Sequence, residues 1–86
     1  MELRLHRGKE SVLRGFRFGA EIRIKRLNYI GKVRVEFSGE TYDLQDQGDS
    51  VIIPEGENTR ISIIGIVRGT HSLGDPLAVI ELDEYD

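Results

Sequence analysis

The stretch EIRIKRLNYIGKVRVEF, residues 21–37, carries the clearest signal of the fold. Apolar and charged side chains alternate along residues 21–25 and again along residues 32–37. A period of two is typical of β-strands that have one buried and one exposed face. Residues 28–31, between the two runs, end in a glycine, which suits a tight turn. The stretch therefore predicts a β-hairpin.

The alternation continues on both sides of this hairpin. Further strands are predicted at residues 3–6, 51–53, 61–67 and 78–83. No segment has apolar residues at helical spacing, and the isoleucine-rich stretch 61–67 suits a pleated surface better than a helix. We predict an all-β fold, a small antiparallel β-sandwich or barrel. The 86 residues form a single domain, residues 1–86.

An internal repeat appears when the chain is shifted by 39 residues. The shift superimposes Leu5 on Leu44, Ser11 on Ser50, Val12 on Val51, Ile22 on Ile61 and Ile24 on Ile63. The two units, residues 3–40 and 42–83, would each contain a strand, a tight turn and a hairpin. One unit cannot bury both of its faces, so we predict that the two units pack as a pseudo-dimer.

Several kinds of site are disfavoured by the composition. The chain has no cysteine, which removes disulfides, thiolate zinc sites and thiol nucleophiles. No catalytic motif surrounds the two histidines, and Asp43, Asp46 and Asp49 lack the glycine and glutamate of a calcium loop. We predict no enzyme activity, no metal and no cofactor. Without a secretory segment or a long apolar run, we expect a cytoplasmic protein that does not enter membranes.

Charge is divided unevenly along the chain. Residues 1–34 hold ten of the twelve Lys and Arg residues and three of the fifteen acids, a net charge of +7. Residues 35–86 carry a net charge of −10. This asymmetry indicates an anion-binding face in the first half or head-to-tail association of opposite halves. The alternative is an ordinary solvated surface.

The basic residues of the first half fall on predicted outward positions. In the predicted hairpin, Arg23 and Lys25 would share one sheet surface with Lys32 and Arg34. A cationic sheet face suits a polyanion such as nucleic acid, because cations that neutralise phosphates release counterions.

Three segments of the first half share a pattern. They are LRLHRGKESV (residues 3–12), FGAEIRI (residues 18–24) and GKVRV (residues 31–35). Together they resemble the carbon storage regulator family of RNA-binding proteins. A second copy of the pattern runs through GDSVII (residues 48–53) and RISIIGI (residues 60–66). The resemblance implies a translational regulator that binds GGA-containing hairpin loops in messenger leaders and blocks translation. The chain would be a tandem, single-chain version of that family's dimer.

The resemblance also implies where RNA would bind. The first strand and its basic turn match the family's RNA-contacting edge, whereas residues 40–44 lack the arginine that the family carries there. The acidic second unit would repel phosphate, so at most one of the two RNA surfaces of the family's dimer would be retained in this chain. The predicted contacts, from the charge pattern and the resemblance together, are Arg4, Leu5, His6, Arg7, Arg23, Lys25, Lys32 and Arg34.

Two other hypotheses remain open at this level. The acidic half could bind a basic protein, as an inhibitor or a nucleic-acid mimic. Its contacts would be Asp43, Asp46, Asp49, Glu55 and Glu57. Alternatively, the oppositely charged halves could associate head to tail and form a homo-oligomer whose stability depends on salt.

Overall fold

The computed structural model describes residues 1–6, 9–14, 16–28, 31–56, 60–67 and 76–85. Over these ranges the chain forms strands and no helix. The strands are β1 (Glu2–Leu5), β2 (Glu10–Arg14), β3 (Ala20–Leu27), β4 (Gly31–Phe37), β5 (Glu40–Leu44), β6 (Ser50–Ile53), β7 (Arg60–Val67) and β8 (Ala78–Glu84). The all-β class predicted from the alternation is confirmed.

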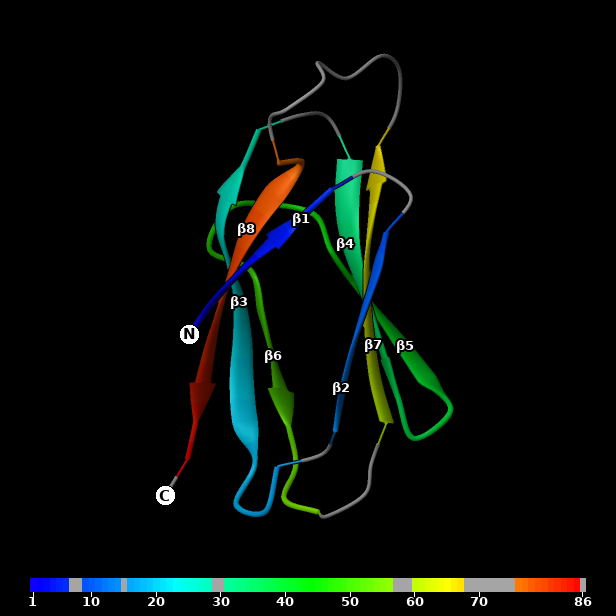
Figure 1. The fold of residues 1–86 in the computed structure, drawn as a ribbon, viewed down its shortest axis with the longest axis vertical. Coiled ribbons are helices and arrows are strands. Elements are labelled where there is room, and N and C mark those ends of the chain that lie inside the picture. The colour runs from blue at the N-terminus through cyan, green and yellow to red at the C-terminus, as the bar shows by residue number, and fades with distance from the viewer. Residues whose placement is uncertain (7–8, 15, 29–30, 57–59, 68–75, 86) are drawn as a thin grey trace.

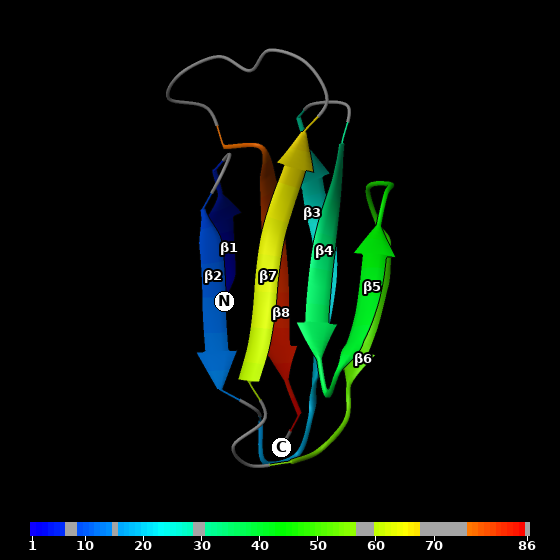
Figure 2. The ribbon, with the colours of Figure 1, turned by 90° about the vertical axis from the view of Figure 1, so that its right-hand side faces the viewer.

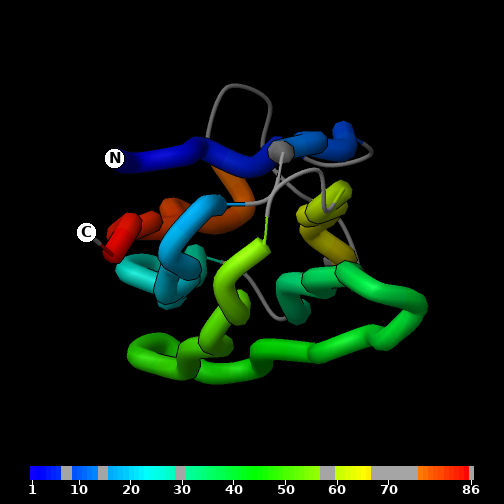
Figure 3. Tube along the Cα trace, turned by 90° about the horizontal axis from the view of Figure 1, so that it is seen from below, coloured from blue at the N-terminus to red at the C-terminus, as the bar shows by residue number. Residues whose placement is uncertain are grey.

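The strands build two antiparallel sheets that pack face to face (Figures 1 and 2). The first sheet has the order β1-β8-β3-β6, and the second sheet has the order β2-β7-β4-β5. Among the described strands, only β4 and β5 are neighbours both in the chain and in a sheet. The chain crosses from one layer to the other at its remaining connections, as the β5–β6 segment shows in Figure 3. This strand order is that of a jelly roll.

The inward positions of both sheets form one apolar core. On β3, Ile22 and Ile24 are at most 1% exposed, and Val33 and Val35 of β4 are fully buried. Burying a side chain of this size stabilises the fold by about 1.5–3 kcal/mol. The remaining core residues are Leu5, Ala20, Phe37, Leu44, Val51, Ile53, Ile61, Ile63, Leu77, Ala78, Ile80 and Leu82. Alternation therefore identified the buried faces of β3 and β4 correctly, whereas it did not predict β2 and β5 as strands.

The predicted hairpin between residues 21–25 and 32–37 is wrong. β3 pairs with β6 and β8 in the first sheet, whereas β4 pairs with β5 and β7 in the second. Their apolar faces meet across the core instead of lying side by side. Alternation fixes which residues face inward, but it does not fix which strand lies alongside. The two pairs of cations in the predicted hairpin, Arg23 with Lys25 and Lys32 with Arg34, consequently face opposite sides of the molecule.

The two halves of the chain have related positions in the fold. Replacing each strand by the fourth one after it converts the order β1-β8-β3-β6 into β5-β4-β7-β2, which is the second sheet read backwards. The registers agree in two of the three strand pairings. The matching pairs are Leu5·Ala78 with Leu44·Val33, and Ile24·Ile80 with Ile63·Val35. The duplication of residues 3–40 and 42–83 as sequences stays a prediction.

Candidate anion-binding site

Three cationic side chains gather at one end of the outer face of the first sheet. Arg4 extends from β1, and Lys25 and Arg26 extend from β3. With Glu2, Gln47 and Val79 they line a recess of about 330 Å³, which we call the cationic recess. Its volume lies at the lower end of the range that ligand pockets occupy.

A β-bulge in β3 brings two consecutive cations to the same face. The register between β3 and β8 shifts between Ile24 and Arg26, so Lys25 is the extra residue. In a regular strand, consecutive side chains point to opposite faces, and one of these cations would point into the core. At the bulge both Lys25 and Arg26 are exposed.

The β5–β6 loop supplies Gln47 to the recess. The carboxylate of Asp49 accepts hydrogen bonds from the backbone N–H groups of Gln45 and Asp46, at 3.1 and 3.0 Å. Gly48 donates its N–H to the carbonyl of Ile24, and Ile24 donates its N–H to the carbonyl of Asp49, each at 2.9 Å. These bonds shape the loop and fasten it against β3. Gln47 is thereby held beside the bulge.

One of the three cations has an internal carboxylate partner. Lys25 donates a hydrogen bond to Glu2, and this contact lowers the pKa of Glu2 and raises the pKa of Lys25. Both side chains are about half exposed, so the pair is accessible to solvent and ions. Arg4 and Arg26 form no ion pair with any other described residue. Counted by formal charge, the lining carries +2.

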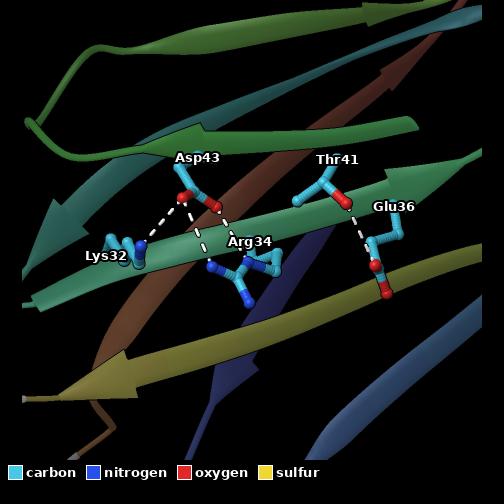
Figure 4. A network of polar contacts seen from close by, with 5 residues as sticks. All are labelled: Lys32, Arg34, Glu36, Thr41 and Asp43. Atoms are coloured by element: carbon cyan, nitrogen blue, oxygen red, sulfur yellow. Dashed lines mark hydrogen bonds and ion pairs between the residues drawn. The ribbon is translucent and has the colours of Figure 1, made fainter.

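Two cations of the second sheet share one carboxylate of the chain (Figure 4). Lys32 lies 2.8 Å from Oδ2 of Asp43, and Nε of Arg34 lies 3.0 Å from its Oδ1. These hydrogen bonds, that of Arg34 first, lower the pKa of Asp43 to about 2. The carboxylate therefore stays ionised at neutral pH. Lys32 and Arg34, both predicted RNA contacts, are engaged in this cluster.

The other predicted contacts do not lie on a common surface. Arg23 is on the outer face of the first sheet and pairs with Glu21 at 2.8 Å. Leu5 was predicted to contact RNA, but its side chain is 1% exposed and packs in the core. Neighbouring side chains of β1 point to opposite faces of the sheet, so Leu5 points inward where Arg4 points outward. His6 follows β1 and is half-buried, and Arg7 lies outside the described residues. Arg4 and Lys25 are the predicted contacts that the recess brings together.

The described acidic residues that were predicted to bind a basic protein lie at separate places in the fold. Asp43 binds two cations of β4, and Asp49 shapes the β5–β6 loop. Asp46 is exposed on that loop, whereas Glu55 is exposed beyond the opposite end of β6. Glu57 lies outside the described residues. No described cluster of these acids favours a protein-binding surface.

Sequence reasoning missed four residues of the recess, namely Glu2, Arg26, Gln47 and Val79. Arg26 breaks the alternation of β3 and was not counted as an outward residue, although two consecutive cations after an alternating run are a possible sign of a bulge. Gln47 carries no charge, and Val79 belongs to a strand about 50 residues from Arg26 in the chain. Nothing in the sequence marks these two residues as lining a shared site.

Comparisons with known proteins give no match. No protein-family model, no curated protein and no solved structure matches the chain. The resemblance to carbon storage regulators therefore stays a hypothesis based on the segments quoted above.

Among the described residues there is no cluster of His, Asp or Glu suited to a metal ion. Within the same ranges, no helix is long and apolar enough to cross a membrane.

Proposed function

We propose that this chain binds RNA and that the cationic recess holds phosphates of the RNA backbone. One observation carries the proposal: Arg4, Lys25 and Arg26 line one recess, and the two arginines form no ion pair with any described residue. Guanidinium groups bind phosphate oxygens through two parallel N–H donors, and a lysine adds a point charge. The resemblance to RNA-binding regulators supports RNA as the polyanion.

The proposed contact is smaller than the one expected from the sequence. The recess offers three cations, whereas the contacts predicted from the sequence included six Lys and Arg residues. Affinity would come from a few phosphates held at one end of the first sheet. Bound there, the protein would occlude a short segment of a messenger, the mode of regulation that the resemblance implies.

The salt dependence of binding tests this proposal. We would measure the affinity for a fluorescent single-stranded oligoribonucleotide by anisotropy at several salt concentrations. Each contacted phosphate contributes about −0.7 to the slope of log K against log salt for single strands, so three contacts give a slope of about −2. Contacts through all six predicted Lys and Arg residues would give a slope of about −4.

The outcomes separate the possible surfaces. A slope near −2 supports the recess. A slope near −4 contradicts it, because cations elsewhere would then contact the RNA. No detectable binding at low salt would overturn RNA binding altogether.

A further inference from the structure

We propose that the cationic recess takes a terminal phosphate of RNA, a phosphomonoester, in preference to an internal phosphodiester. This inference rests on the proposed function and names the group that the site selects. It follows from the charge of the lining, from the geometry of its two arginines, and from the corresponding position on the second sheet.

The charge of the recess matches a monoester. Its three cations and Glu2 leave a net charge of +2. A phosphomonoester carries about −1.5 to −2 at pH 7 and offers three acceptor oxygens. An internal phosphodiester carries one negative charge and leaves one positive charge of the lining unbalanced. Outside the lining, Glu81 of β8 lies cross-strand from Glu2 and from Arg23, and Arg23 is paired with Glu21.

The two arginines are placed to hold one phosphate between them. Arg4 of β1 and Arg26 of β3 are both cross-strand partners of Val79 in β8. Their Cα atoms are therefore about 10 Å apart, twice the spacing of neighbouring strands. Both long side chains can reach a phosphate above Val79. Glu2 and Gln47 also line the recess. The RNA chain continues from a terminal phosphate on one side only, so a single strand end has to pass between these side chains, whereas an internal phosphate has two.

The second sheet contains an anion at the corresponding position. When each strand is replaced by the fourth one after it, the second sheet has Asp43 at the position of Arg4. It has Arg34 at the position of Val79. In the second sheet, the carboxylate of Asp43 therefore completes a cluster with Arg34 and Lys32. In the first sheet the carboxylate of Glu2 is hydrogen-bonded to Lys25, and neither Arg4 nor Arg26 forms an ion pair with a described residue. A ligand can supply an anion to these two arginines.

The experiment compares two oligoribonucleotides of one sequence, one with a 5′-phosphate and one with a 5′-hydroxyl, both labelled at the 3′ end. At pH 7.5 we expect the phosphorylated RNA to bind about five- to tenfold more tightly, since its terminal phosphate carries close to one full negative charge more than the internal phosphodiester that the hydroxyl RNA would place in the recess. At pH 5.5 the advantage should shrink, because the second ionisation of a phosphomonoester has a pKa near 6.

The hydroxyl RNA controls for titration of the protein. His6, which follows β1, and Glu2 and Glu81 near the recess affect both RNAs, so the ratio of the two affinities isolates the phosphate. Arg26→Gln should bring the ratio close to one, and Arg60→Gln on the second sheet should leave it unchanged. Equal affinities in the wild type, with Arg26→Gln weakening both, would overturn this inference and leave RNA binding intact. Binding of neither RNA would overturn the proposed function as well.

Discussion

Arg4 and Arg26, which belong to strands two positions apart in the first sheet, are both aligned with Val79 of the strand between them. Neither arginine has an ion-pair partner among the residues that the structure describes. Two unpaired guanidinium groups above an apolar residue form a minimal receptor for an anion. On the opposite side of the molecule, by contrast, Arg34 is paired with Asp43.

Replacing Arg26 with glutamine tests the recess directly. Removing one of three cations should reduce RNA affinity about three- to tenfold and make the salt slope shallower by about 0.7. Anisotropy titrations at three salt concentrations would measure both. The matched control is Arg60→Gln, an exposed arginine of β7 on the other sheet. Equal losses in the two variants would mean that the cations act only through net charge.

In the proposed complex, Glu2 would compete with the phosphate for Lys25. Its carboxylate holds the ammonium group by a hydrogen bond and an ion pair. In Glu2→Gln the formal charge of the lining rises to +3 and Lys25 is released, so RNA binding should tighten about three- to tenfold. The same titration measures this change. An unchanged or weaker affinity would show that Lys25 takes no part in the site.

Asp43 makes the stability of the fold depend on acid. Its pKa in the folded protein is about 2, below the ordinary value of 3.8, because Arg34 and Lys32 hold its ionised form. A depressed pKa means that this carboxylate stabilises the fold above about pH 4. That stabilisation is lost as the pH falls from about 4 through about 2.

Urea denaturation at pH 6 and pH 2.5 would measure this effect. The wild type should lose more stability between the two pH values than Asp43→Asn, which lacks the titrating group. Asp46→Asn, at an exposed position of the β5–β6 loop, is the control and should behave like the wild type. The same acid sensitivity in wild type and Asp43→Asn would contradict the role of the cluster.

Gly19 is required at the start of β3 for two reasons. Its φ is +88°, and a Cβ there would lie 2.7 Å from the carbonyl oxygen of Ile53. We expect Gly19→Ala to cost more than about 2 kcal/mol of unfolding free energy. Gly39→Ala is the control, since Gly39 has a φ of +75° but open space around it. Its cost should be about 1 kcal/mol, measured by thermal and urea denaturation. Equal costs would show that the contact with Ile53 can relax.

Much of the fold could be predicted from local patterns. The alternation around Ile22 and Ile24 identified a strand and its buried face, and that around Val33 and Val35 did the same. Burial depends mainly on side-chain polarity and on the period of the backbone, and both can be seen in the sequence. The class of fold followed from the number of such runs and from the absence of helical spacing.

The neighbours of each strand could not be predicted. A tight turn and a crossing between sheets both suit residues 28–31, and the pairing of β3 with β8 depends on contacts about 60 residues apart. The recess was missed for the same reason, because its lining comes from β1, β3, β8 and the β5–β6 loop. The bulge at Lys25 also breaks the alternation from which exposure had been deduced.

An NMR titration of the ¹⁵N-labelled protein with a 5′-phosphorylated oligoribonucleotide tests the location of binding most directly. The expected result is that the largest amide shifts fall on Arg4, Lys25, Arg26 and Gln47, with the signals of Lys32 and Arg34 nearly unchanged. Shifts concentrated on β4 and β5, or spread evenly over both sheets, would contradict the cationic recess as the RNA-binding site.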